Sequence, residues 1–344
     1  MAYQKQQPGE SLKEITDKLE QGIQTLFSSE NYAAYLKTMS KFYSYSFNNT
    51  LLIYLQRPDA SLVAGYGAWK KTFARQVKRG EHGIRILAPS PYKAKMETDR
   101  IDPATNRPMI GKDGNVIKDE IEIQRASFRP VTVFDVSQTE GKELPTLGAD
   151  ELTGNVAGYA NFFAALNRVA PVPVAFEQIA SGAKGYFHTE EQRIAIQEGM
   201  SEVQIVKTAI HEITHAMLHN YHADKEKEVP PEQRKDRHTK EVEAESVAYT
   251  VCQHYGIDTA EYSFAYVAGW SSGRDTKELK GSMELIRSTA ADMITQIDGR
   301  YQEIVKAQEQ EKAPALQGII QSAKNTAGHL TPVGPKTKTE REPE

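Results

Sequence analysis

The chain has 344 residues, enough for two domains with a core each, and its 39% hydrophobic and 26% charged residues are typical of a globular protein. No stretch approaches the ~18 apolar residues of a membrane-spanning helix, residues 1–20 lack a signal-peptide core, and the single cysteine, Cys252, excludes an internal disulfide. We therefore predict a cytoplasmic protein with no membrane segment.

The net charge of −4 is unevenly distributed. Residues 1–150 carry 21 Lys and Arg against 18 Asp and Glu, whereas residues 151–344 carry 21 against 28, so a basic module is joined to an acidic one. We predict an α+β protein of two domains. The expected boundaries are a first domain at 1–136, a linker at 137–150, a second domain at 151–308 and a disordered tail at 309–344.

The first domain is predicted to open with three helices, because apolar residues recur at helical spacing from Leu12 to Leu26. Residues 93–125 are polar around a Gly-rich turn at 111–115, which indicates an exposed hairpin. Helices are expected at 10–28, 31–43 and 47–56 and near Trp69, and strands at 61–65, 84–88 and 128–136.

Aromatic and basic residues are concentrated in the first domain. Ten aromatics fall within residues 32–73, and nine Lys and Arg against two acids fall within 57–95. This combination favours single-stranded nucleic acid, because bases stack on rings while cations follow phosphates. The alternative is that the aromatics are core and the charges a solvated face. The residues predicted to contact single-stranded DNA are Tyr45, Trp69, Lys70, Lys71, Arg75, Lys78 and Arg79.

The second domain is predicted to be mostly helical with a small antiparallel sheet. Residues 137–150 contain Gly141, Pro145 and Gly148 and indicate a linker. From residue 309 the chain is rich in Gln, Glu, Lys, Pro and Thr, which favours disorder. Between them we expect a helix at 151–168, strands at 172–176 and within 185–196, a helix around residue 211, another at 239–252 and a long helix at 276–308.

The most informative motif is His211-Glu212-Ile213-Thr214-His215, which lies in an apolar, helix-forming run. Residues i and i+4 share one face of a helix, so both imidazoles can bind one metal ion. This is the H-E-x-x-H arrangement of zinc-dependent hydrolases, in which Glu212 is the general base. The alternative is a helix with two hydrogen-bonded histidines that bind nothing.

A third ligand is expected from the helix at 239–252. Glu241 is the first choice and Glu245 is expected to contact a ligand histidine from outside, although the two roles could be exchanged, and Glu243 points away from this face. His219 continues the histidine face by one more turn. Its commoner role would be that of a histidine near the C-terminal end of the helix dipole, and the alternative is a contact with a ligand histidine.

Two histidines and a carboxylate leave the fourth position of a zinc ion for water, whose pKa falls towards neutrality. Glu212 would take a proton as the water attacks a carbonyl and return it to the leaving amine, which is peptide hydrolysis. The hairpin at 185–196 could bind an extended peptide by strand addition or be scaffold alone. The protein or peptide substrate cannot be predicted.

Several sequence blocks together resemble the ArdC-type antirestriction proteins. In the first domain these are YSFNNTLL at 45–52, VAGYGAWK at 63–70 and RGEHGIRI at 79–86. In the second they are the His211–His215 motif, EVEAE at 241–245 and AGW at 268–270. The 241–245 block is also similar to a Glu-x-x-Ala-Asn/Asp helix of the ImmA/IrrE-type peptidases, with Glu245 where an amide or Asp often stands.

The resemblance implies a single-stranded-DNA-binding domain followed by a zincin-like metallopeptidase domain, in proteins that protect incoming DNA of mobile elements from restriction. It implies His211, His215 and Glu241 as zinc ligands and Glu212 as base. Two other functions stay open. One is a non-catalytic protein that masks DNA and holds a structural metal, and the other is a regulatory peptidase that cleaves a repressor.

Overall fold

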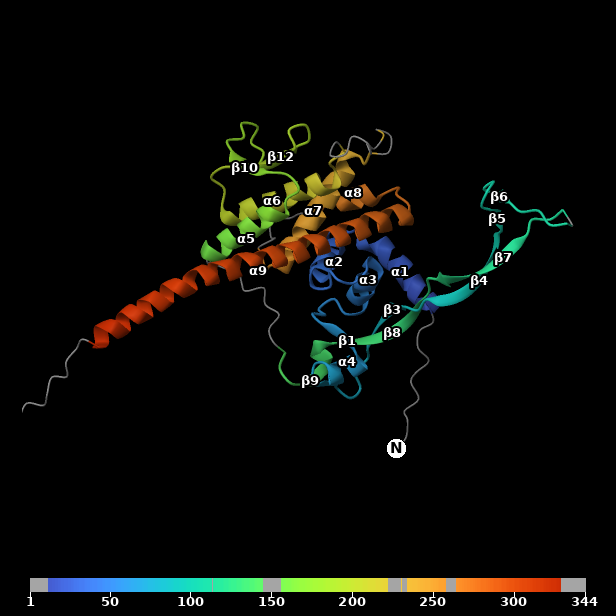
Figure 1. The fold of residues 1–344 in the computed structure, drawn as a ribbon, viewed down its shortest axis with the longest axis horizontal. Helices are drawn as coiled ribbons and strands as arrows, with labels where there is room; N and C mark the ends of the chain where they lie inside the picture. Colours follow the sequence, from blue (N-terminus) through green and yellow to red (C-terminus); the bar gives the residue numbers. More distant parts are fainter. Residues whose placement is uncertain are drawn as a thin grey trace, which may run out of the picture.

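The computed structural model describes residues 12–112, 114–144, 156–221, 230, 234–257 and 264–328. Helices and small sheets alternate along this part of the chain, as the predicted α+β class requires (Figure 1). No helix within these residues is both long and apolar enough to cross a membrane.

Three helices open the described chain, as predicted. They are α1 (Leu12–Leu26), α2 (Ser29–Lys41) and α3 (Phe47–Gln56). The apolar stripe of α1 is buried from Ile15 to Leu26, which explains why this face packs inward. The Ser46 side chain accepts a hydrogen bond from the backbone N–H of Asn49 and so caps the start of α3.

A three-stranded antiparallel sheet follows, in the order β1-β8-β3. Its strands are β1 (Val63–Gly65), β3 (Ile84–Pro89) and β8 (Phe128–Asp135), and the short helix α4 (Tyr66–Lys71) follows β1. The predicted linker differs from expectation at its start. The 3-10 helix η1 (Val136–Gln138) leads into β9 (Thr139–Gly141), which pairs with β2 (Arg75–Val77). Residues 145–150 lie outside the described residues.

The expected exposed hairpin is confirmed as a long two-stranded ribbon of β4 (Tyr92–Asp99) and β7 (Lys118–Arg125), which projects from the body (Figure 1). Its outer end holds β5 (Ile101–Asp102) and β6 (Arg107–Pro108). Ion pairs such as Lys95–Glu120 cross one face, while Met96 lies opposite Ile121 on the other.

The carboxy-terminal part is mostly helical, as predicted. Its small sheet, in the order β10-β12-β11, is mixed, because β12 (Arg193–Gln197) runs antiparallel to β11 (Gly185–His188) and parallel to β10 (Val174–Glu177). The helices are α5 (Val156–Val169), α6 (Glu202–Leu218), α7 (Arg237–His254), α8 (Val267–Ser271) and α9 (Thr276–Gly328). The last helix continues 20 residues beyond its predicted end at 308, so residues 309–328 are helical where a disordered tail was expected.

The two parts of the chain share one buried core. Helix α2 packs against α7, and the buried hydroxyl groups of Tyr32 and Ser246 lie 2.8 Å apart. The backbone N–H of Phe47 donates to the Glu284 carboxylate of α9 at 3.0 Å. The division into two domains at 137–150 stays a prediction, but the helices on its two sides are packed together.

Candidate metal centre

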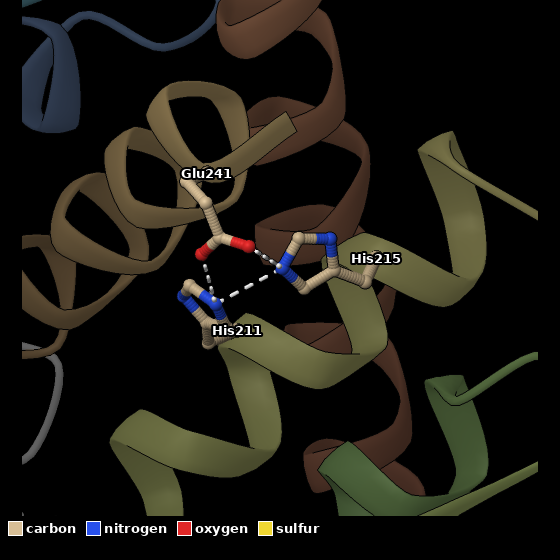
Figure 2. Close-up of side chains that lie close together, drawn as sticks. All are labelled: His211, His215 and Glu241. Atoms are coloured by element: carbon tan, nitrogen blue, oxygen red, sulfur yellow. Dashed lines mark hydrogen bonds and ion pairs between the residues drawn. The ribbon is translucent and has the colours of Figure 1, made fainter. Parts of the chain in front are cut away.

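Helices α6 and α7 bring two histidines and a carboxylate to one point. His211 and His215 project from neighbouring turns of α6, and Glu241 reaches them from the first turns of α7 (Figure 2). One ligand atom from each residue lies within 4.8 Å of the other two. Helix α6 begins after Ser201, which forms a reciprocal capping box with Gln204.

The separations fit a metal ion held between the three groups. The two histidine Nε2 atoms are 3.0 Å apart, and the Glu241 carboxylate oxygens lie 3.5 Å from the Nε2 of His211 and 3.7 Å from that of His215. Tetrahedral zinc with bonds of about 2.0 Å separates its ligand atoms by about 3.3 Å. The donor set therefore suits a divalent metal, with both Nε2 lone pairs directed at one place.

Glu245 lies where a partner of a ligand histidine is expected. Its carboxylate is 3.1 Å from the Nδ1 of His211, on the side of the ring away from Glu241. Burial alone would lower the pKa of His211, but hydrogen bonds to Glu241 and Glu245 raise this pKa to about 10. Hydrogen bonds to His211 and His215 lower the pKa of Glu241 well below its usual range.

Glu212 lies at the wall of a cavity of about 290 Å³ beside these ligands. The cavity is also lined by His211 and Glu245, by Lys184 and Gly185 from the start of β11, and by Lys207 of α6. Only 8% of Glu212 is exposed, and burial raises the pKa of its carboxyl group. A raised pKa suits a carboxylate that must take up and release a proton.

Strand β11 is an edge strand beside this cavity. Gln197 donates its N–H to the carbonyl oxygen of Lys184, so in the alternating antiparallel pattern Gly185 and Phe187 direct their backbone groups to the outer edge. The backbone N–H of Phe187 indeed bonds the Glu212 carboxylate. The edge strand thus positions the predicted base.

The sequence left two roles open for His219, and the structure combines them. It caps the end of α6, but its side chain is 5% exposed and its Nδ1 lies 2.9 Å from the Nδ1 of His215. Its Nε2 lies 3.0 Å from the carboxylate of Glu243, which is fully buried. The continued i+4 spacing of three histidines was the signal that pointed to this contact.

The charges of Glu245 and Glu241 act on the hydroxyl group of Tyr266. Burial raises its pKa, and the charges of Glu245 and Glu241 raise it further. Tyr255 is engaged elsewhere, since its hydroxyl donates to Asp298 at 2.8 Å.

Two of the seven residues predicted to contact DNA have structural roles. Trp69 is fully buried and its indole N–H donates to the carbonyl oxygen of Phe134 at 2.9 Å, so it cannot stack on a base. The Arg75 guanidinium donates to Thr139, Gly141 and Lys142 between β2 and β9. Aromatic and basic composition overestimates DNA binding here. The sequence does not distinguish a buried ring from an exposed one, or a cation that is hydrogen-bonded within the protein from one that is available to a phosphate.

The other predicted contacts are more accessible. Lys70, Lys71, Lys78 and Arg79 are exposed, although Lys78 also donates to the carbonyl oxygen of Ser137. Tyr45 is partly buried, and its hydroxyl donates to the carbonyl oxygen of Val63 at 3.5 Å. Sequence reasoning passed over the exposed aromatic beside these cations, Tyr66, which is 59% exposed at the start of α4.

Comparisons with known proteins cover both parts of the chain. An uncharacterized protein of Bacillus anthracis, pXO2-81, is 27% identical over 98% of this chain, and this chain spans 60% of that protein's length. Crystal structures of the antirestriction protein ArdC from plasmid R388 also match. The metal-free one is 18% identical with a TM-score of 0.47, covering 75% of this chain and 86% of that one. The Mn(II)-bound one is 19% identical with a TM-score of 0.49, covering 82% and 97%.

The family comparison gives the clearest result. Residues 5–134 match the family model described as the N-terminal domain of anti-restriction factor ArdC. This range contains α1 to α4, the β1-β8-β3 sheet and the projecting ribbon. The amino-terminal part of the chain is therefore similar to the N-terminal domain of ArdC.

Proposed function

We propose that this chain is a single-stranded-DNA-binding zinc metallopeptidase that acts in the cytoplasm in antirestriction, protecting incoming DNA of mobile elements. The observation that carries the peptidase part is the convergence of His211, His215 and Glu241 beside the buried Glu212. The family model supports the antirestriction part.

The proposed ligands are His211, His215 and Glu241, with Glu245 bonded to the outer nitrogen of His211. Two imidazoles and a carboxylate suit zinc, and the same donors also accept Mn(II). When bound, the metal supplies a Lewis acid that polarises a carbonyl group and lowers the pKa of water.

The remaining steps belong to the chain's own residues. Glu212 accepts a proton from the attacking water and transfers it to the leaving amine, and its raised pKa favours the first of these transfers. An extended peptide would lie along the outer edge of β11 and hydrogen-bond to the backbone of Gly185. This edge lines the cavity that holds Glu212, so the peptide would pass the base.

Replacing the base tests the peptidase proposal. We expect Glu212→Gln to bind one zinc ion as the wild type does but to lose at least about 100-fold in the rate of cleaving a proteome-derived peptide library, measured by mass spectrometry. His211→Ala is expected to lose both zinc and cleavage. Equal cleavage by the wild type and Glu212→Gln would reject Glu212 as the base.

The DNA-binding part of the proposal rests on the exposed cations Lys70, Lys71 and Arg79 with the exposed ring of Tyr66. Helix α4 carries Lys70 and Lys71 and packs against β2, and Arg79 follows β2 by two residues, so we place the three cations on one basic track. Cations would follow the phosphates while the ring stacks on a base.

Salt-dependent binding tests the track. The triple variant Lys70→Ala/Lys71→Ala/Arg79→Ala should bind an oligodeoxythymidine more weakly, with a salt slope smaller by about 2, because each phosphate contact contributes about 0.7. Lys93→Ala/Lys95→Ala is the matched control, since both lysines are paired with Glu122 and Glu120 on the ribbon. An unchanged slope in the triple variant would place DNA binding elsewhere.

The two alternative functions predict different outcomes for Glu212→Gln. A non-catalytic DNA-masking protein would keep full protection of incoming DNA in this variant. A regulatory peptidase would lose cleavage of one specific repressor, and DNA would serve only to localise it. The preparation of Glu212 by burial and by the edge strand favours the catalytic reading.

A further inference from the structure

The two proposed ligand histidines are supported from outside in different ways. The Nδ1 of His211 faces a carboxylate, that of Glu245, at 3.1 Å. The Nδ1 of His215 instead faces another imidazole, the Nδ1 of His219, at 2.9 Å. A ligand histidine most often donates this N–H to a carboxylate, a carbonyl group or water, so the contact with His219 needs an explanation.

The contacts beyond His219 continue through two more side chains. The Nε2 of His219 lies 3.0 Å from Oε2 of Glu243, and Oε1 of the same carboxylate lies 2.5 Å from Nζ of Lys235. Glu243 is fully buried and His219 is 5% exposed, whereas the Lys235 side chain is 34% exposed. The contacts therefore run from the ligand, through a buried imidazole and a buried carboxylate, to a cation near the surface.

The direction of every hydrogen bond in this series is fixed by its two ends. The Nε2 of His215 faces Glu241 and His211, so it is the ligand atom and Nδ1 carries the hydrogen. The Nδ1 of His219 must then accept, which leaves its Nε2 to donate to Glu243. Lys235 has only hydrogens to offer and donates to the other oxygen. Each group has the role that its neighbour requires.

We propose that His219, Glu243 and Lys235 form a positioning chain that holds the His215 ring in the tautomer and orientation needed for metal binding. This inference rests on the proposed metal site. The chain also explains why a carboxylate with no exposed surface lies on α7, two residues from Glu241 and directed to the other side of His215. Its charge is balanced by Lys235, and its lone pairs are used by two donors.

The test is zinc affinity of the full-length protein, measured by competition with a chromogenic chelator. In His219→Leu, an apolar side chain cannot accept the N–H of His215, and we expect zinc affinity to fall about 10–100-fold. In His219→Gln, the amide oxygen can accept that hydrogen while the NH₂ group donates to Glu243, so affinity should stay within about threefold of the wild type. The visible spectrum of the Co(II)-substituted protein should change in the first variant and not in the second.

A control separates positioning from loss of stability. His254→Leu removes a partly buried histidine of α7 whose Nδ1 lies 3.0 Å from the carbonyl oxygen of Ser40. This histidine is 13 residues further along α7 than Glu241. It should lower the Tm without changing zinc affinity or the Co(II) spectrum. If His219→Leu does not fold, Glu243→Gln gives the same readout, because its amide cannot accept from both His219 and Lys235.

The outcomes distinguish this inference from the proposed function. Zinc affinity within twofold of wild type and an unchanged Co(II) spectrum in folded His219→Leu would overturn the positioning chain while leaving the peptidase proposal intact. Failure of the wild type to bind zinc or Co(II) would overturn both. A loss of affinity in His219→Leu that His219→Gln restores would support the chain.

Discussion

At the scale of single residues, Gly185 sets the distance between the edge strand and the helix that carries the site. A Cβ atom there would lie 2.5 Å from the Thr208 methyl group, 2.9 Å from the carbonyl oxygen of Ala195 and 3.3 Å from Cγ of Glu212. The Ala195 contact is with backbone and cannot rotate away. A side chain at this position must therefore shift β11 relative to its partner strand β12, and it also crowds Thr208 and Glu212 of α6.

We therefore expect Gly185→Ala to lower the free energy of unfolding by about 1–3 kcal/mol, as overpacking does, and to reduce peptide cleavage. Urea denaturation and the cleavage assay measure the two effects. Gly67→Ala is the control, because a Cβ there meets no atom within 4 Å. If the two variants were equally stable, β11 would not be held tightly against α6.

The sequence predicts which proposed ligands lie together better than it predicts which aromatic residues are exposed, for a physical reason. Helical spacing alone places His211 and His215 on one face of α6. Glu241 lies beside them because α7 packs against α6, and the three residues come together as the sequence suggested. Burial depends on distant parts of the chain, so Trp69 was read as a surface ring although it is fully buried. The role of His219 depends on Glu243, 24 residues away, which spacing within one helix cannot reveal.

At the scale of elements, the β4-β7 ribbon extends from the β1-β8-β3 sheet without forming part of it. Strands β3 and β8 already form a hairpin whose end is closed by the Ser90 N–H donating to the carbonyl oxygen of Ser127 at 2.7 Å. Most ribbon residues are exposed, and the ribbon's ion pairs join its own two strands. Exposed pairs of this kind contribute little to stability.

Replacing residues 92–125 by an Asn-Gly turn should change the free energy of unfolding by less than about 1 kcal/mol, because few buried contacts are lost, and should leave zinc affinity unchanged. Chemical denaturation and zinc competition test this. A loss of several kcal/mol would mean that the ribbon folds against the body in solution.

Helices and strands could be predicted where the apolar pattern and the length of a segment agree. They were missed where a strand pairs with a distant part of the chain. The three first helices and the ribbon follow local periodicity. Strand β9 lies in a segment with linker composition and forms because β2, more than 60 residues earlier, offers an edge. The turns of α9 after residue 308 lie in a sequence with little apolar periodicity. Apolar periodicity is the signal by which a helix is recognised, so this part of α9 was not predicted.

At the scale of the whole molecule, the amino-terminal helices form part of the support for the candidate metal centre. One face of α7 carries Glu241 and Glu245, and another carries Ser246 and Thr250, which contact Tyr32 and Met39 of α2. Tyr32 is completely buried and also packs edge-on against Phe264. The packing of α2 and the position of the ligands therefore depend on the same helix.

We expect Tyr32→Ala to lower the free energy of unfolding by about 3–5 kcal/mol, as truncation of large buried aromatics does, and Tyr32→Phe by about 1 kcal/mol through the lost hydrogen bond. Far-UV circular dichroism and zinc release should follow one shared urea transition in both variants. Zinc release at a separate midpoint would show that the two parts unfold independently.

The packing of α2 against α7 also affects which hybrids of two related chains can fold after genetic recombination. A crossover within residues 137–150 falls between segments that look separable in sequence, yet it would divide a single hydrophobic interior. The hybrid would press the α2 of one parent against the α7 of another, where Tyr32 must meet Ser246 and Met39 must meet Thr250. Exchange between diverged relatives of this chain should therefore keep the amino-terminal helices together with the helix that presents Glu241.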